Sequence, residues 1–213
     1  MKRFVLAIIF LSVVYLSNSY PQDLKPIQLP QPQTEIGKPL MQVLKLRQST
    51  RSFDSKPLPL QELSNLLWAA YGINRPESGK RTAPSAMNWQ EFDIYVVLQE
   101  GVYVYDAKDN VLNQIAKGDY RELCGGQDFV KSAPLNLVYV ADFTRIKKMN
   151  NEDLSPFVGM DCGFIAQNVY LYCASQELGV VVRAGIDGNR FAETLKLKAD
   201  QKVILAQTVG YSK

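Results

Sequence analysis

Residues 91–105 read EFDIYVVLQEGVYVY, two runs of β-branched and aromatic residues joined at Glu100-Gly101. Runs of this kind favour strands, and a glycine-containing turn between two of them predicts an antiparallel hairpin. Further along the chain, residues 135–141 read LNLVYVA, which is almost continuously apolar, as in a strand covered on both faces. The middle of the chain therefore predicts a sheet with a fully buried strand.

Helical periodicity flanks these strands. Residues 60–71 (LQELSNLLWAAY) place Leu63, Leu67 and Trp68 on one helical face, and Gly72 follows where a helix would end. Residues 157–178 predict the longest helix, about six turns at ~3.6 residues per turn. Shorter helices are predicted at residues 37–46, 111–116 and 188–197, and further strands at 180–182 and 202–209. Strands separated by helices, together with one hairpin, predict an α+β domain with a mixed sheet under packed helices.

The N-terminus has the pattern of a secretory signal peptide. Lys2 and Arg3 precede an apolar run from Phe4 to Leu16, which is too short to span a bilayer as a helix, and small polar residues follow it. We expect cleavage after residue 19, and hence a periplasmic or secreted protein with no stable membrane span; an uncleaved anchor is the alternative. Residues 20–36, rich in Pro and Gln, predict an extended arm, and residues 37–213 the folded domain.

Composition excludes several classes of function. Histidine is absent, which rules out Ser-His-Asp triads, Cys-His dyads and His-ligated zinc. The net charge is +3, and without Lys2 and Arg3 it would be +1 (3 − 2). With no basic stripe along the chain, a nucleic-acid partner is not expected. A bound redox cofactor remains compatible with this composition, since such a cofactor needs no histidine.

The three cysteines, Cys124, Cys162 and Cys173, form no CxxC motif for a metal cluster or a redox pair. The last two share the helix predicted at 157–178, where their separation is about 16 Å at ~1.5 Å per residue, too far for a disulfide. They are expected to be buried apolar side chains. Cys124 lies in a polar Cys-Gly-Gly-Gln stretch and is expected to be exposed, which leaves a redox role open.

Arg47, Ser49 and Arg51 lie together where the helix predicted at 37–46 ends. Two guanidinium groups with a hydroxyl between them form a set of donors that suits a phosphate. A solvated basic loop is the simpler interpretation, and the spacing alone does not separate the two.

A second polar segment, residues 84–90, reads PSAMNWQ. Asn88 and Gln90 each offer a donor and an acceptor, which matches the pyrimidine edge of a flavin, and the small residues could lie against a flat ring. A turn with an Asx cap is the alternative. Together with the phosphate-like segment, it suggests a phosphorylated cofactor with a polar ring.

A third segment, Arg183-Ala184-Gly185-Ile186-Asp187, follows the strand predicted at 180–182. The backbone N–H groups of Ala184 and Gly185 could point at a ligand, and glycine lets the chain approach it closely. An ordinary strand-to-helix loop is the alternative. Arg183, and Arg81 ahead of the second segment, could orient a substrate or simply carry surface charge.

In this order the three segments resemble those of the nitroreductase-like, FMN-dependent oxidoreductases, over roughly residues 27–211. Residues 47–51 (RQSTR) look like that family's Arg-Arg-Ser-x-Arg phosphate segment, and residues 84–88 (PSAMN) like its Pro-Ser-Ser/Ala-x-Asn segment. Residues 66–72 (LLWAAYG) and 101–106 (GVYVYD) look like the branch with the dehydrogenases that oxidise peptide azolines. Residues 209–211 (VGY) resemble the family's Gly-Tyr-Pro turn.

The resemblance implies an α+β homodimer with two FMN molecules at the subunit interface. One subunit would hold the phosphate and ring with Arg47, Gln48, Ser49 and Arg51. The other would contribute Pro84, Ser85, Ala86 and Asn88, and the backbone at Ala184 and Gly185 would face flavin N5. Small residues on the longest helix would permit close packing of another helix or of a second subunit, namely Gly159, Gly163, Ala166 and Ala174. Two departures are Gln48 in place of a second arginine and Ser212 in place of proline; Lys213 could substitute for the absent basic C-terminal arm.

The function expected from this resemblance is electron transfer through flavin N5 to a small organic acceptor, such as a nitroaromatic or a quinone. The cofactor would carry the chemistry, so no catalytic side chain is named. An exported protein without a GxGxxG motif is expected to take its electrons from another protein or a quinol rather than a nicotinamide. The alternatives are a flavin-binding protein without turnover, a peptide-azoline dehydrogenase, and a flavin-free structural domain.

Overall fold

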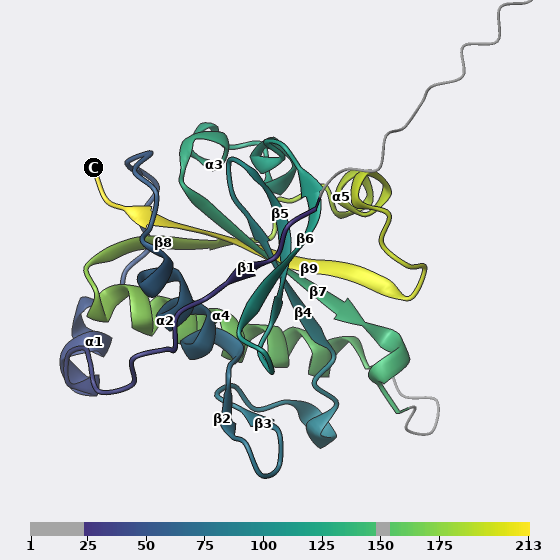
Figure 1. Cartoon of the computed structure of the whole chain (residues 1–213), viewed down its shortest axis with the longest axis horizontal. Helices are drawn as coiled ribbons and strands as arrows, with labels where there is room; N and C mark the ends of the chain where they lie inside the picture. Colours follow the sequence, from purple (N-terminus) through teal and green to yellow (C-terminus); the bar gives the residue numbers. More distant parts are fainter. Residues whose placement is uncertain (1–23, 148–153) are drawn as a thin grey trace, which may run out of the picture.

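The computed structural model describes residues 24–147 and 154–213. In these residues, seven strands form one antiparallel sheet in the order β1-β6-β5-β4-β7-β9-β8 (Figure 1). β2 and β3 form a separate ribbon. The strands are β1 (Ile27–Gln28), β2 (Ile73–Arg75), β3 (Lys80–Arg81), β4 (Phe92–Val97), β5 (Gly101–Asp106), β6 (Val111–Lys117), β7 (Leu135–Asp142), β8 (Leu178–Arg183) and β9 (Gln201–Tyr211). The predicted hairpin is confirmed as β4 and β5, and the predicted buried strand as β7, in which every residue is buried.

The α+β class is confirmed, but every pair of described strands is antiparallel, so the predicted mixed sheet is wrong in this respect. Helix α4 (Ser155–Ser175) crosses from β7 to β8, and a crossover helix usually joins parallel strands. Here β9 lies between β7 and β8 and pairs antiparallel with both. The two strands joined by α4 therefore run in the same direction without being neighbours.

Residues 111–117 form β6, so the helix predicted at 111–116 is wrong. Leu112 and Ala116 are both buried, and their spacing fits one face of a helix as well as one face of a strand. The neighbouring strand decides the outcome, because β6 pairs with β5 over its whole length, with Leu112 opposite Tyr105. Asn110, in the left-handed region at φ 51°, turns the chain into this strand.

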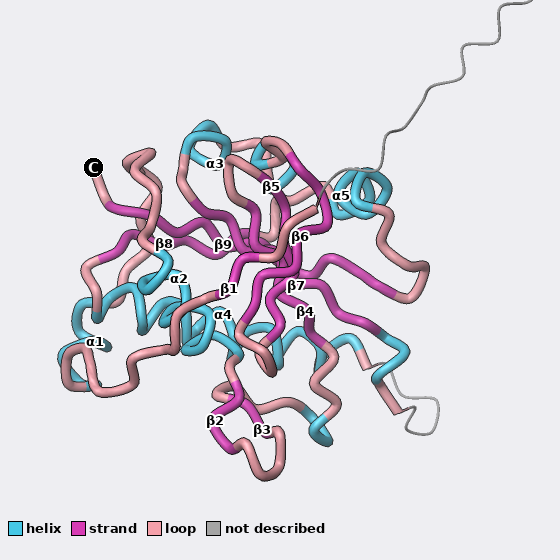
Figure 2. Tube along the Cα trace, viewed as in Figure 1, coloured by secondary structure: helices cyan, strands magenta, loops and turns pink. Residues whose placement is uncertain are grey.

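Helices cover both faces of the sheet, and Figure 2 shows them in cyan on either side of the magenta strands. α1 (Leu40–Leu46), α2 (Leu60–Tyr71) and α4 lie on one face, and α3 (Asp128–Ser132) and α5 (Gly188–Leu195) on the other. The pleat of β7 serves both layers: Leu137 and Tyr139 join the core under α2 and α4, and Val138 and Val140 the core under α5. The described residues also form the 3-10 turns η1 (Ala86–Asn88), η2 (Arg121–Cys124) and η3 (Phe143–Arg145). Helices predicted at 37–46, 60–71, 157–178 and 188–197 are confirmed.

The described part of the predicted arm, residues 24–36, is extended and adds β1 to the edge of the sheet. Ile27 pairs with Leu112, and Leu29 is buried in the core beneath. The predicted signal peptide, residues 1–19, lies outside the described residues, so cleavage and export remain predictions. Over residues 24–147 and 154–213, no helix has both the length and the apolar character needed to cross a bilayer.

All three cysteines are free and buried. Cys162 and Cys173 lie inside α4, as predicted, whereas the expectation of an exposed Cys124 is wrong. Cys124 packs in the core under α5, and its backbone carbonyl accepts a hydrogen bond from Arg183 at 2.6 Å. Burial raises the pKa of this thiol to about 12, so it is not a reactive thiolate at neutral pH.

Candidate functional site

The predicted phosphate segment, residues 47–51, leaves the C-terminus of α1 and runs along β8. Arg47 ends the helix with φ −58° and ψ 120°, and the Thr50 N–H donates to the carbonyl of Val180 at 2.8 Å. Ser49 and Arg51 are exposed, as is Gln48 between them and Arg47. The segment is thus fixed by its backbone while its polar side chains stay open to a ligand.

Tyr170 of α4 joins this segment to the end of β8. Its hydroxyl lies 2.8 Å from the Ser49 hydroxyl and accepts the Val182 N–H at 3.0 Å. The guanidinium of Arg47 lies over its ring, 5.3 Å from the centroid. Tyr170 was not predicted from the sequence; the available signal was a tyrosine on the buried face of a helix, where its hydroxyl requires a partner.

Beyond β8, the backbone at Ala184 and Gly185 is exposed. A Cβ added at Gly185 would meet no atom within 4 Å, so a flat ligand can approach this stretch closely. Tyr170 therefore brings the first and third predicted segments together, since it contacts Ser49 in one and Val182 just before the other.

Arg183, next to this stretch, points into the protein. It is 8% exposed, and its guanidinium donates to Cys124, Asn136 and Thr208 at 2.6, 3.2 and 2.9 Å. Burial lowers its pKa. The expectations that Arg183 orients a substrate or carries surface charge are both wrong, because its donors tie β8 to β7 and β9.

The second predicted segment forms the strained turn η1. Met87, Asn88 and Gln90 have φ of 49°, 55° and 49°, in the left-handed region that non-glycine residues rarely adopt. Strain of this kind often accompanies ligand sites. Pro84, Met87 and Asn88 are exposed, and Ser85 and Ala86 are half-buried.

Hydrogen bonds from inside hold this turn. The Ala86 N–H donates to the carboxylate of Asp161 on α4 at 2.7 Å, and the Gln90 N–H to the Ser85 hydroxyl at 3.0 Å. The Gln90 side chain accepts from Arg81 at 2.8 Å and donates to Gly79 and Asn88, so it is committed to the turn rather than free for a flavin.

Arg81 is equally committed. It lies over the Tyr71 ring, 4.3 Å from the centroid, and donates to the Tyr71 carbonyl at 2.8 Å. Its guanidinium thus holds the β2–β3 ribbon against α2 and the turn. A substrate-orienting role for Arg81 has no support in these contacts.

The turn and the phosphate segment contact different parts of α4. Asp161 holds the turn and Tyr170 the phosphate segment, and nine residues of helix separate them by about 14 Å at ~1.5 Å per residue. Within one copy, the structure brings residues 47–51 and 184–185 together and places residues 84–88 apart from them.

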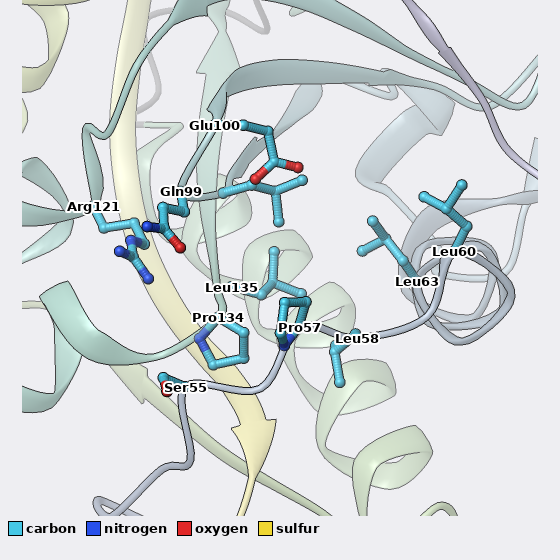
Figure 3. A pocket seen from close by; sticks show the side chains of 11 residues that line it. Ser55, Pro57, Leu58, Leu60, Leu63, Gln99, Glu100, Arg121, Pro134 and Leu135 are labelled. Atoms are coloured by element: carbon cyan, nitrogen blue, oxygen red, sulfur yellow. The ribbon is translucent and has the colours of Figure 1, made fainter.

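Two hollows bear on where a ligand could lie. A hollow of about 330 Å³ adjoins the phosphate segment and is lined by Gln48, Thr50, Val180 and Ser212 among others. At the chain's end, the Lys213 N–H donates to the Ser52 carbonyl at 3.3 Å, so the C-terminus lies beside this segment. The pocket in Figure 3, between Pro57, Glu100 and Pro134, encloses only about 80 Å³. Ligand sites typically measure about 300–1,000 Å³, so this pocket is too small to be the cofactor site.

Exposed large apolar side chains lie on three elements that pack together, since α4 contacts both α1 and η1. We call these side chains the apolar outer face: Leu40, Met41, Leu44, Met87, Met160 and Phe164. Gly159 and Gly163 lie on α4 and are exposed, and a Cβ added at either glycine would meet no atom within 4 Å. Exposed large apolar side chains gathered on neighbouring elements are typical of an interaction site.

The chain is similar to known proteins along most of its length. A family model described as "Nitroreductase family" matches residues 44–211. "Putative nitroreductase MJ1384" of Methanocaldococcus jannaschii is 36% identical over 186 residues, covering 83% of this chain and 92% of that protein. The crystal structure of a "putative nitroreductase" from Ralstonia eutropha JMP134 is 45% identical, with a TM-score of 0.83, over 88% of this chain and 90% of that chain. A chain of the E. coli microcin synthetase McbBCD complex has a TM-score of 0.70 at 20% identity, over 100% of this chain and 85% of that chain, a likeness of fold alone.

Proposed function

This chain belongs to the nitroreductase family and is an oxidoreductase, and we propose that it works with FMN, bound where residues 47–51 meet residues 184–185. The observation that carries the proposal is the set of contacts of Tyr170, which link a phosphate-suited segment to an open stretch of backbone. A ligand that carries both a phosphate and a flat ring needs a phosphate-binding segment and an open stretch of backbone held at a fixed distance from each other.

The residues present fit FMN. Arg47 and Arg51 offer guanidinium groups that bind a phosphate with charge-assisted hydrogen bonds, and Ser49 adds a hydroxyl between them. The unobstructed backbone at Gly185 allows the isoalloxazine ring to lie close. FMN when bound would supply the transfer of electrons through N5; the protein's part is to bind, orient and exclude water.

We infer that the site is completed by a second copy. Residues 84–88 contact α4 at Asp161, about 14 Å along the helix at ~1.5 Å per residue from Tyr170, which contacts the phosphate segment, so the two segments lie at different levels of α4. The apolar outer face includes side chains of α1, which leads into the phosphate segment, of α4, and of η1 within the turn. A homodimer formed through this face would bury these side chains and bring the turn of one subunit toward the cofactor of the other.

The acceptor we propose is a small organic molecule such as a nitroaromatic or a quinone. A flat acceptor can stack on the exposed face of the bound ring, and exposed Met87 offers an adaptable apolar contact beside it. If the signal peptide is cleaved and the protein exported, a protein or quinol electron donor follows. A peptide-azoline dehydrogenase is the second candidate, supported by residues 66–72 and 101–106 and by the shared fold with the McbBCD chain.

The visible absorption spectrum of the purified protein tests the cofactor. We expect flavin bands and about one FMN released per chain, together with a dimeric mass by light scattering. Reduction under anaerobic conditions, followed by reoxidation with a nitroaromatic and a quinone, tests the reaction. A colourless protein that does not bind added FMN would overturn the proposal, and tight FMN binding without reoxidation by either acceptor would favour a protein without turnover.

A further inference from the structure

Two carboxyl groups are buried directly behind the turn at residues 84–88. Glu91, immediately after the turn, has none of its surface exposed, and Asp161 on α4 is 3% exposed. Acidic residues are almost never buried to this extent unless they are paired. No lysine or arginine pairs with either carboxyl group among the ion pairs of the described residues, so another arrangement must stabilise them.

The two groups are neighbours, since each changes the pKa of the other. Asp161 accepts the Ala86 N–H at 2.7 Å. Within the part of the chain that the structure describes, neither side-chain oxygen of Glu91 has a hydrogen-bond partner. A buried carboxyl group without a donor is most stable in its neutral form, and a neutral carboxyl group can itself donate to a neighbouring carboxylate. The Ala86 N–H favours the charge on Asp161, which leaves the proton on Glu91.

The groups that face Glu91 do not remove this proton. Tyr71 of α2 and Cys162 of α4 are neutral neighbours, and burial raises the pKa of each. Arg145 of η3 favours a charged Glu91, but its guanidinium is bonded to Asp93 at 2.8 Å. Burial raises the pKa of Glu91 to about 7; its own backbone N–H opposes this shift in part, and the charge of Asp161 adds to it.

We propose that Glu91 and Asp161 are positioning residues for the flavin: by sharing one proton they fix the Ala86 N–H, and with it the turn that covers the flavin of a second subunit. The inference rests on the proposed function. Loss of the shared proton places two like charges side by side in a buried space, and their repulsion acts on α4 and the turn at once. Flavin binding should therefore weaken as the pair ionises.

The test measures the dissociation constant of the full-length apoprotein for FMN by quenching of FMN fluorescence, at pH 6, 7, 8 and 9. For wild type we expect the dissociation constant to rise across this range, by about tenfold for a pKa of the pair that is one unit higher with FMN bound than without it. In Glu91→Gln the amide donates to Asp161 at every pH, so the dissociation constant should stay level. Glu62→Gln is the matched control: Glu62 accepts from Tyr172 at 2.6 Å between α2 and α4, away from the turn, and should keep the wild-type slope.

A second measurement does not need flavin. The pKa of Glu91 is about 7 in the folded state against an ordinary 4.5, so between these values the folded protein holds a proton that the unfolded chain has released. The free energy of unfolding of the apoprotein should therefore fall as the pH rises from 4.5 to 7 and then level off. Glu91→Gln should reduce this fall, and Glu62→Gln should retain it.

The outcomes separate the two proposals. Equal slopes in wild type and Glu91→Gln, with FMN binding intact, overturn the carboxyl pair alone. A wild type that binds no FMN overturns the proposed function and with it the role toward flavin, while the unfolding measurement still decides whether the proton is shared. If Glu91→Gln does not fold, Asp161→Asn replaces it, because its amide can accept from Ala86 and donate to Glu91 and should also abolish the slope.

Discussion

The phosphate segment and the turn at residues 84–88 are held in opposite ways. The phosphate segment is anchored by a backbone hydrogen bond from Thr50 to β8 and by Tyr170. The turn has left-handed residues at Met87 and Asn88 and depends on one buried carboxylate, Asp161. The phosphate segment is therefore hydrogen-bonded to the edge of the sheet, whereas the turn has a strained backbone and is held by α4.

The difference indicates which half of the site one subunit can complete. The phosphate segment, Tyr170 and Gly185 are already together in a single copy, so they can bind the tail and approach the ring. Strained residues persist only where their surroundings determine them, and the surroundings of the turn are α4 and the apolar outer face. If the proposed homodimer forms, we expect the turn to act in contact with the second copy, and the two halves should respond differently to substitution.

The largest expected effect comes from removing both guanidinium groups of the phosphate segment, in Arg47→Ala with Arg51→Ala. Charge-assisted hydrogen bonds contribute about 1.5–3 kcal/mol each, so FMN should bind at least about a hundredfold more weakly. Titration with riboflavin, which lacks the phosphate, provides the comparison, and its affinity should change little. Arg190→Ala, an exposed arginine on α5, is the matched control variant. Unchanged FMN affinity in the double variant would place the phosphate elsewhere.

The next effect tests whether the turn requires a second copy. Phe164 is 45% exposed on α4, so Phe164→Lys should leave the fold of one copy intact. A lysine buried in an interface without a partner costs about 2–5 kcal/mol, which should shift the protein toward monomers. We expect light scattering to report a smaller mass and the purified protein to carry less FMN.

The control for this variant is Ile115→Lys, on β6 and 36% exposed, away from the apolar face. It should leave both mass and FMN content unchanged. A monomeric Phe164→Lys protein with full FMN occupancy would contradict the claim that the turn of a second subunit completes the site.

Features that depend on local sequence could be predicted, and features that depend on distant partners could not. α2 was predicted at the correct residues because its leucines follow a helical period and Gly72 ends it. β6 was mistaken for a helix because the spacing of Leu112 and Ala116 suits both structures, and only pairing with β5 decides between them. The three candidate segments were proposed because their residue types suit a ligand whatever the fold, and they stay a prediction.

Residues that act through others were missed for a physical reason. In the sequence, Tyr170 and Asp161 are ordinary residues of a long helix. Their roles appear only in the folded structure, where Tyr170 contacts β8 and Asp161 contacts the turn. Arg183 and Cys124 were misjudged because their burial depends on partners from distant strands, such as Asn136 and Thr208. The local sequence shows which contacts a side chain can make, but the partner is supplied by a strand or helix that is distant in the sequence.

The smallest effect expected is that of Tyr170→Phe, which removes one oxygen from the better-anchored half. The Val182 N–H would lose its acceptor and Ser49 its partner, at a cost of about 1–3 kcal/mol in the free energy of unfolding. Because Ser49 and the end of β8 would no longer be tied together, FMN should bind more weakly by roughly tenfold, within the same energy range. Tyr172→Phe, two residues along α4, removes a hydroxyl that is bonded to Glu62 instead, and it should lower stability without changing FMN affinity. Equal losses of FMN affinity in the two variants would mean that Tyr170 acts through general stability, and the distinction between the two halves of the site would then rest on the turn alone.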